Sequence, residues 1–374
     1  MRIAKTLRPE SPLTNAIPSL NITRTIPTTA AVSDVISIYR PTKLFQRDDV
    51  KEGKTKPQIL SIDFDDPGEF CMTSESDETI QIYNVKDGRH DKTLLSKKYG
   101  VKLARFTHAN SSIIYASTKQ NHAIRYLSTH DNSFLRYFEG HEGDVTDLAM
   151  HPGHDIFLSC GRDNKMFLWD MRTKNWNGRF NLHTPSLSAW DPSGNVFAVA
   201  CPGSATVLLY DHGNWTKAPF GNFDILKAAG NIHPEACFEG WTKLAFSNDG
   251  KHLLLGSKYG GHFLLDAFDG SLKAYLKKPN GGTKRMGAGD PEGSGVVSSG
   301  NCCFTPDGRY VISGCKNDLL IWDTLVTPDE KSMLEPAHIL EEKREAEVVA
   351  HNPRFNMLAT ADNDLMFWLP DPHA

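Results

Sequence analysis

The sequence predicts an all-β fold, a seven-bladed β-propeller, and two repeating features of the chain support this prediction. The first is a large apolar, usually aromatic, residue near the end of a β-like run, which recurs at intervals of roughly 40 to 60 residues, close to the length of one blade. These seven residues are Tyr83, Tyr126, Trp169, Tyr210, Leu265, Trp322 and Trp368. The second is a tight turn containing proline, aspartate or glycine a short distance before most of them, at residues 65–68, 151–154, 191–194, 247–250 and 305–308. Because two unrelated signals repeat in step, repetition of one blade-like unit is the simplest interpretation.

The segment Gly140–Asp170 is the most complete copy of this unit. It contains three β-like runs, 145–150, 156–160 and 166–169, which polar turns separate. The Gly-His pair at its start and the Trp-Asp pair at its end resemble the frame of a WD repeat. In that family a histidine, a strand hydroxyl, a turn aspartate and the tryptophan form a hydrogen-bonded set that holds the blade together. The resemblance places this set, as structural residues without a catalytic role, on His141, Ser159, Asp163 and Trp169.

The two ends of the repeat array are predicted to complete one blade together. The last unit, Ala346–Pro370, holds three strands, whereas a candidate outer strand, Thr42–Gln46, precedes the first complete unit. We expect the segment Pro41–Gln46 to pair with the last blade and close the ring, because this leaves fewer free sheet edges. The propeller is therefore predicted over residues 35–370, with a disordered N-terminal tail at 1–34 and a short tail at 371–374.

Three insertions interrupt the repeat, at Phe223–Gly240, Lys277–Ser298 and Leu325–Glu345. The second is rich in glycine, but its glycines fit neither G-x-G-x-x-G nor G-x-x-x-x-G-K, the two common phosphate-binding patterns. It is therefore predicted to be a solvated or disordered loop. The third is predicted to contain a short outer strand at His338–Glu341, followed by a charge run that we interpret as a solvated face.

Composition is ordinary for a globular protein, since 39% of the 374 residues are hydrophobic and 23% are charged. No apolar run approaches the roughly 20 residues of a membrane-spanning helix. The seven cysteines form no C-x-x-C pair and no signal peptide is recognised, so a reducing cytosolic or nuclear compartment is expected. The basic N-terminal segment faintly resembles a transit peptide, but its prolines would break an amphipathic helix, which favours a disordered tail.

The chain lacks the sequence patterns of a catalytic or metal site. It has neither a nucleophile elbow nor an H-E-x-x-H motif. His151 and His154 flank a Pro-Gly turn without further ligands at metal-binding spacing. We therefore expect a protein that is not an enzyme, that holds no metal or cofactor, and that acts by binding partners.

Charge is unevenly distributed along the chain. The segment Lys86–Arg136 contains ten basic and three acidic residues, a net charge of +7, although the whole chain has a net charge of −4. Lys97, Lys98 and Tyr99 lie in the connection that enters the second repeat, where propellers commonly present binding loops. A phosphopeptide, an RNA or an acidic protein tail would find charge and an aromatic surface there, and a solvated basic edge is the alternative. The candidate binding residues are Lys97, Lys98, Tyr99 and Arg125, with Arg105 and Arg136 as weaker candidates.

A more specific resemblance covers the same region. The motifs SKKYG, AIRYLS and HDN follow one another within Leu94–His141. This order is similar to the second blade of the WD-repeat subunit shared by COMPASS-type histone lysine methyltransferases and the RNA 3′-end processing and phosphatase machinery. Further similarity lies at Trp241–Lys251 (WTKLAFSNDGK), Leu264–Gly270 (LLDAFDG) and Met366–Pro370 (MFWLP). The N-terminal tail and the glycine-rich insertion depart from the family pattern.

The resemblance implies a nuclear, non-catalytic subunit. Such a subunit helps to place a lysine-four histone methyltransferase on transcribed chromatin, in part through the phosphorylated C-terminal domain of RNA polymerase II. The implied partners are the methyltransferase catalytic subunit, other COMPASS subunits, and cleavage/polyadenylation and protein phosphatase subunits, without membrane binding or direct recognition of a DNA sequence. The alternative is a generic WD-repeat scaffold, for example a substrate adaptor of a ubiquitin ligase.

Overall fold

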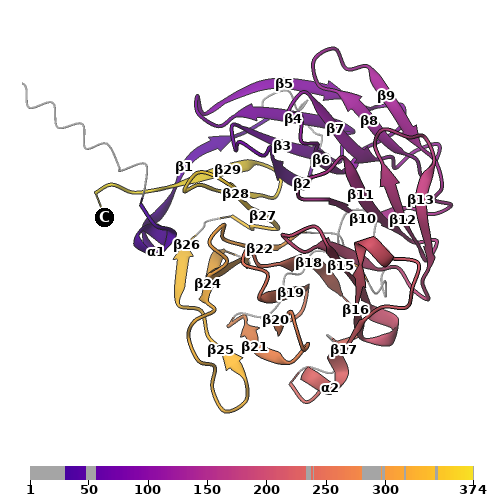
Figure 1. Cartoon of the computed structure of the whole chain (residues 1–374). Helices are drawn as coiled ribbons and strands as arrows, with labels where there is room; N and C mark the ends of the chain where they lie inside the picture. The colour runs from indigo at the N-terminus through magenta and orange to yellow at the C-terminus, as the bar shows by residue number, and fades with distance from the viewer. Residues whose placement is uncertain are drawn as a thin grey trace, which may run out of the picture.

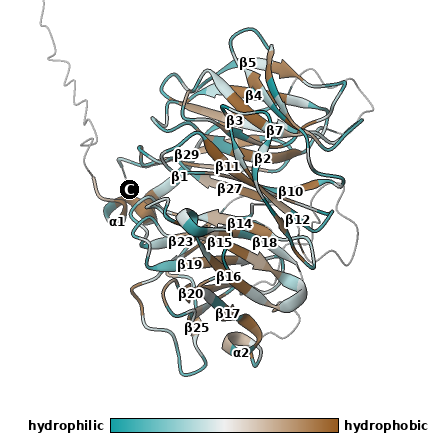
Figure 2. Ribbon diagram, turned by 45° about the vertical axis from the view of Figure 1, so that its right-hand side comes forward, coloured by the Kyte–Doolittle hydropathy of each residue, from teal (hydrophilic) through white to brown (hydrophobic). Residues whose placement is uncertain are grey.

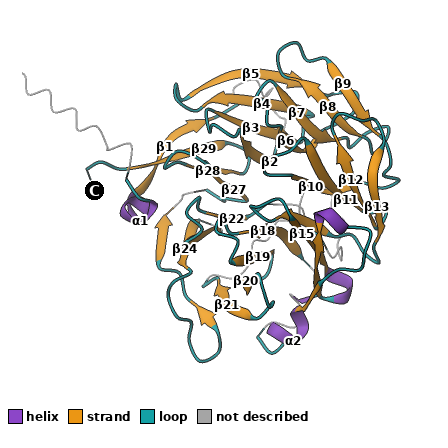
Figure 3. Cartoon of the chain, viewed as in Figure 1, coloured by secondary structure: helices purple, strands orange, loops and turns teal. Residues whose placement is uncertain are grey.

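The computed structural model describes residues 30–47, 56–232, 237–238, 240–279, 296, 300–315, 317–341 and 344–373. These residues form seven antiparallel blades around a common centre, with very little helix (Figures 1 and 3). The predicted seven-bladed β-propeller is confirmed. Within the described residues, no helix is long and apolar enough to cross a membrane.

We number the blades 1 to 7 from the first complete unit, and each begins with the strand nearest the centre. Blade 1 contains β2 (Ile59–Phe64), β3 (Phe70–Glu75), β4 (Thr79–Asn84) and β5 (Arg89–Leu95), and blade 2 contains β6 (Lys102–Phe106), β7 (Ser112–Ala116), β8 (Ile124–Ser128) and β9 (Phe134–Phe138). Blade 3 contains β10 (Val145–Met150), β11 (Ile156–Gly161), β12 (Lys165–Asp170) and β13 (Trp176–Asn181), and blade 4 contains β14 (Leu187–Trp190), β15 (Val196–Cys201), β16 (Thr206–Asp211) and β17 (Gly221–Asp224). Blade 5 contains β18 (Trp241–Phe246), β19 (His252–Ser257), β20 (Gly261–Asp266) and β21 (Leu272–Lys277). Blade 6 contains β22 (Cys302–Phe304), β23 (Tyr310–Gly314), β24 (Asp318–Asp323) and β26 (His338–Glu341), and blade 7 contains β27 (Val348–His351), β28 (Leu358–Ala361), β29 (Leu365–Pro370) and β1 (Tyr39–Phe45).

The hydrophobic core lies between the blades. Phe138 of blade 2, for example, packs edge-on against Phe157 and Trp169 of blade 3, with ring centroids 5.1 and 5.5 Å apart. The apolar colour in Figure 2 follows the strands, and the loops are mostly hydrophilic. This explains why the second and third strands of a blade are almost continuously apolar, since neighbouring blades cover both of their faces.

The chain closes the ring through β1, which pairs antiparallel with β29 from Tyr39–Pro370 to Phe45–Leu365 (Figure 1). The predicted closure is confirmed, but the strand begins at Tyr39 and ends before Gln46. The side chain of Tyr39 is buried, and its hydroxyl lies 3.2 Å from Nε2 of His351 on β27. Because Tyr39 is buried, the residues just before it also lie against the propeller.

Two short helical elements precede β1. Helix α1 (Val32–Val35) and the 3₁₀ helix η1 (Ile36–Ile38) bury Val35 and Ile36 in the cluster between blades 6 and 7. Helix α1 begins at Val32, within residues 1–34, the segment that was predicted as a tail. Of the tail predicted as disordered, residues 1–29 lie outside the described residues.

The structure describes most residues of the first and third insertions. In the first, β17 leads into helix α2 (Ile225–Ala229), where the Asp224 carboxylate accepts the Lys227 amide at 2.9 Å. Most of the glycine-rich insertion lies outside the described residues. In the third, the predicted outer strand at His338–Glu341 is confirmed as β26.

The third insertion also holds an unpredicted strand, β25 (Met333–Leu334), which joins blade 5 as a parallel fifth strand beside β21. Its position depends on contacts with blade 6, because the Trp322 indole N–H donates to the Leu334 carbonyl at 3.1 Å and the Leu334 side chain is buried. Because β25 has only two residues and is positioned by contacts with other strands, it could not be predicted from the local sequence.

Candidate partner-binding surface

The structure places the four residues of the blade 3 set in one buried chain of hydrogen bonds. The Trp169 indole N–H donates to Ser159 Oγ at 2.8 Å, and Ser159 Oγ lies 2.7 Å from His141 Nε2. His141 Nδ1 lies 3.1 Å from the Asp163 carboxylate. Because an indole N–H can only donate, Ser159 can give its own proton to His141, which leaves the Nδ1 proton for Asp163.

The same set accounts for the charge state of Asp163. Burial by itself would raise the Asp163 pKa, but hydrogen bonds from His141 and from the Glu142 amide outweigh burial and lower it. The four side chains use their polar atoms on one another, and Asp163 also accepts the backbone amides of Glu142 and Lys165. They offer no group to a substrate, which suits a structural role.

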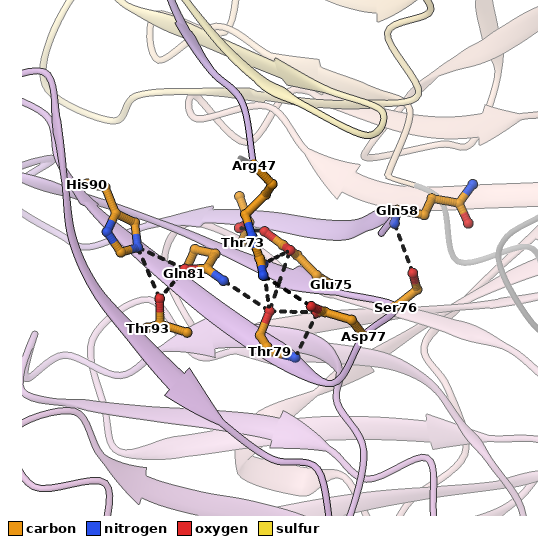
Figure 4. A network of polar contacts seen from close by, with 10 residues as sticks. All are labelled: Arg47, Gln58, Thr73, Glu75, Ser76, Asp77, Thr79, Gln81, His90 and Thr93. Carbon is orange, nitrogen blue, oxygen red and sulfur yellow. Dashed lines mark hydrogen bonds and ion pairs between the residues drawn. The ribbon is translucent and has the colours of Figure 1, made fainter. Parts of the chain in front are cut away.

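Blade 1 has a different polar network at the corresponding end, which the sequence analysis missed (Figure 4). Arg47, just after β1, donates to Glu75 Oε2 at 2.7 Å and to Asp77 Oδ2 at 3.3 Å. Thr79 also donates to Asp77, at 2.7 Å, and Gln81 donates to Thr79 at 3.0 Å. The only signal in the sequence was the acidic turn that contains Glu75 and Asp77. Its cationic partner, Arg47, lies in a different segment of the chain, so the pair could not be recognised from the sequence.

Lys97, Lys98 and Tyr99 lie together in the connection between β5 and β6, at an end of the propeller where the blades are joined. The connection is a tight turn in which the amides of Tyr99 and Gly100 both donate to the Ser96 carbonyl. Gly100 has φ +72°, and a Cβ there would lie 1.9 Å from Thr118 Oγ1, so the turn requires glycine. The turn is thereby held against the β7–β8 loop of blade 2.

Both lysine side chains of this turn are exposed. Among the described residues, neither ammonium forms an ion pair or a hydrogen bond, although Lys98 Nζ lies 5.0 Å from the Tyr99 ring centroid. Both lysines are therefore available to an anionic partner.

Arg125, one of the candidate binding residues, lies beneath Tyr99 and is buried. Its side chain is only 2% exposed, and its Cζ is 3.4 Å from the Tyr99 ring centroid and 4.9 Å from that of Tyr137. Nε donates to Ser117 Oγ at 2.8 Å, and Nη2 donates to Asn121 Oδ1 at 3.1 Å. The arginine therefore supports the aromatic rings from inside, and its guanidinium does not face a partner.

The structure separates the two weaker candidates from this turn. Arg105 lies on the inner strand β6 and lines the central channel. Arg136 lies on the outer strand β9, and its guanidinium donates to the Met171 carbonyl of blade 3. Neighbouring strand residues face opposite sides of a blade, so basic residues that cluster in sequence are dispersed in space.

Two apolar side chains that the sequence analysis missed extend the surface at this corner. Leu95, at the end of β5, is 53% exposed, and Tyr137, on β9, is 38% exposed. Tyr137 also contacts the Arg125 guanidinium that supports Tyr99. We call the exposed residues at this corner the rim surface, formed by Leu95, Lys97, Lys98, Tyr99 and Tyr137.

The side chain of His151 stabilises a turn and joins it to the next blade. His151 Nδ1 accepts the amides of Gly153 and His154, both at 3.0 Å, and its Nε2 donates to the Gly194 carbonyl of blade 4 at 3.1 Å. Burial lowers the pKa of His151 to about 4. Within the part of the chain that the structure describes, no group of three or more His, Cys, Asp or Glu residues is arranged to hold a metal ion.

Comparison with known proteins identifies the repeats and the relatives of the chain. Residues 132–170 and 292–323 match the family model of the WD domain, G-beta repeat. The chain is 37% identical over 317 residues to the COMPASS component SWD2 of Saccharomyces cerevisiae, covering 84% of this chain and 91% of that protein. It is 30% identical over 376 residues to the Set1 complex component swd2 of Schizosaccharomyces pombe, covering 91% and 99% of the two chains.

A third similarity is to an animal protein. The chain is 35% identical over 341 residues to WD repeat-containing protein 82 of Drosophila melanogaster, covering 91% of this chain and 96% of that protein. These similarities extend over nearly the whole propeller and are not limited to single WD repeats. The chain therefore belongs to the family of WD-repeat proteins that includes SWD2 and WD repeat-containing protein 82.

Proposed function

We propose that the chain is a non-catalytic scaffold subunit of a nuclear histone lysine methyltransferase complex of the COMPASS type. The similarity over 91% of the COMPASS component SWD2 carries this proposal. A scaffold role fits the use of polar groups in blades 1 and 3, because both networks bind segments of the protein to each other. The broader role in RNA 3′-end processing and termination rests on the sequence resemblance in blade 2.

A purification from cells tests the complex. Tagged full-length chain recovered from nuclear extract should bring down the methyltransferase catalytic subunit and its associated subunits, with cleavage and phosphatase subunits as a second group. Recovery of ubiquitin ligase subunits in place of both groups would support the generic adaptor and contradict the proposal.

The rim surface is our proposed binding site for the phosphorylated C-terminal domain of RNA polymerase II. A phosphoserine carries nearly two negative charges and three acceptor oxygens, and two unpaired ammonium groups can meet them with charge-assisted hydrogen bonds. Tyr99 is held by Arg125 on one side and remains partly exposed, so it can contact a tyrosine or proline of the tail. Leu95 and Tyr137 extend the apolar part of the contact.

Peptide binding tests the site. Fluorescence anisotropy should show tighter binding of phosphorylated than unmodified polymerase-tail peptides, and added salt should weaken the phosphate-dependent part. The double variant Lys97→Glu, Lys98→Glu should lose this preference. Its matched control is Lys217→Glu, Lys227→Glu, which reverses two exposed charges near β17 and α2. Equal affinity for both peptides would refute phosphate recognition, whereas normal binding by the folded Lys97/Lys98 variant would refute only the site.

A further inference from the structure

The centre of the propeller is an open channel with an unusual charge pattern. Its cavity has a volume of about 460 Å³ and is lined by the inner strands of all seven blades. This volume is within the range of roughly 300–1,000 Å³ that is typical of small-molecule sites. Most lining residues are apolar, but three carboxylates and two cationic groups also line the channel: Asp63, Asp66, Asp147, Arg105 and Lys243. Of these, Asp66 already has a partner, since its Oδ2 lies 2.7 Å from His108 Nδ1.

The carboxylates of Asp63 and Asp147 are fixed by the fold. Asp63 Oδ2 of blade 1 accepts the Phe106 amide of blade 2 at 2.7 Å, and Asp147 Oδ2 of blade 3 accepts the Ser188 amide of blade 4, also at 2.7 Å. Burial raises the pKa of Asp63 to about 6, although Arg105, the Phe106 amide and Lys243 oppose the rise. Each carboxylate therefore joins two blades through one of its oxygens. A nearby cation would stabilise the charged form of the buried Asp63 carboxylate.

The cationic side chains of Arg105 and Lys243 form fewer hydrogen bonds with the rest of the protein. Arg105 Nη1 donates to the carbonyl of its own neighbour Ala104 at 3.0 Å. Lys243 forms no ion pair or hydrogen bond with any other described residue, although the side chain is only partly exposed. No ion pair within 4.0 Å joins these cations to Asp63 or Asp147 in the described part of the chain. A half-buried ammonium without a partner is costly unless a ligand or solvent satisfies it.

This arrangement selects the charge of a ligand. A simple anion would be attracted by Arg105 and Lys243 but repelled by the carboxylates of Asp63 and Asp147. A simple cation would be attracted by the carboxylates but repelled by Arg105 and Lys243. A molecule with one group of each sign can pair with both and leaves the net charge of the channel unchanged. We propose that the central channel binds a small zwitterionic molecule that carries an ammonium and a carboxylate, as amino acids do. The rim surface is not involved, so this site does not rest on the proposed function.

Three linear probes of equal carbon number test this proposal with the full-length chain: 6-aminohexanoate, hexanoate and hexylammonium. Isothermal titration calorimetry should show saturable binding of 6-aminohexanoate at a single site. Each singly charged probe should bind at least about tenfold more weakly, because it lacks one charge-assisted contact. Absence of saturable binding by the zwitterion would overturn the proposal, and equal binding of hexanoate would overturn the ligand class.

Variants test the location of the site. Lys243→Met keeps the aliphatic stem and removes the ammonium, so affinity for 6-aminohexanoate should fall by about tenfold or more. Arg105→Met should also weaken binding, which provides a second variant if either protein folds poorly. Lys227→Met, at the exposed surface of α2, is the matched control and should bind normally. Unchanged affinity in folded Lys243→Met and Arg105→Met proteins would refute the channel as the site.

Discussion

The guanidinium of Arg47 donates to the carboxylate of Glu75 at 2.7 Å, and this contact connects the segment after the closing strand to the first complete blade. The Glu75 side chain is 2% exposed, and burial raises its pKa to about 7 although Arg47 lowers it. The ring is thus held at its junction by backbone pairing of β1 with blade 7 and by this side-chain contact with blade 1.

Removal of the Arg47 charge should weaken the junction. In Arg47→Met, Glu75 would stay buried without its cation, and the free energy of unfolding should fall by up to about 3 kcal/mol near neutral pH. Protonation of Glu75 limits the loss, because the neutral acid tolerates burial. Urea unfolding measures the effect, and the double variant Arg47→Met, Glu75→Gln should recover part of it. A single variant as stable as the wild type would show that the contact is not important.

The buried histidine His351 should make the protein sensitive to acid. Burial lowers its pKa to about 4, against 6.5 for the unperturbed group. The unfolded chain therefore binds a proton that the folded chain resists, so the contribution of His351 to stability should be full above about pH 6.5 and should decline as the pH falls towards 4. His151 and His262, whose pKa values burial also lowers, act in the same direction. Glu75 and Asp63, whose pKa values burial raises, act in the opposite direction.

Unfolding free energies measured across this pH range check the assignment. His351→Gln should flatten part of the decline, whereas His130→Gln, at an exposed turn, should leave it unchanged. A slope identical in wild type and His351→Gln would exclude His351 as a source of the acid sensitivity.

Deletion of the closing strand should disrupt the cooperativity of the whole ring. Phe45 of β1 contacts both Phe367 of blade 7 and Tyr83 of blade 1, with ring centroids 5.0 and 4.7 Å apart. A chain that starts near residue 50 loses these contacts and leaves the edge of β29 unpaired, so it should melt at lower temperature and over a broader range. A chain that lacks only residues 1–29 keeps α1 and β1 and is the control. Calorimetric transitions of equal sharpness in the two truncated proteins would contradict this role of β1.

Trp169→Ala should lower the stability of the protein, whereas a charge reversal in the rim surface should not. The indole is fully buried and donates to Ser159, so its removal leaves a cavity and takes one of the two hydrogen bonds from the Ser159 hydroxyl. The free energy of unfolding should fall by roughly 3–5 kcal/mol. The charge reversal Lys97→Glu, Lys98→Glu should change it little because both side chains are exposed. Denaturation curves of the two proteins compare these effects, and a stable Trp169→Ala protein would be incompatible with the packing described above.

The sequence by itself determined the number of blades, the closure of the ring and the outer strand at His338–Glu341. Each depends on local patterns, namely apolar runs that form strands and turn residues that end them, repeated often enough to count. The hydrogen-bonded set in blade 3 could also be located in advance, through the resemblance of this unit to a WD repeat.

Only the tertiary structure decided which basic residues act together. Lys97, Lys98, Tyr99 and Arg125 meet at one corner, but Arg125 is enclosed there, Arg105 faces the channel and Arg136 contacts blade 3. Charge in a sequence window does not specify which face of a blade a side chain occupies, since that depends on the pleat and on what packs against it. For the same reason the partner of Glu75, the position of β25 and the mixed charges of the central channel depend on contacts between distant segments.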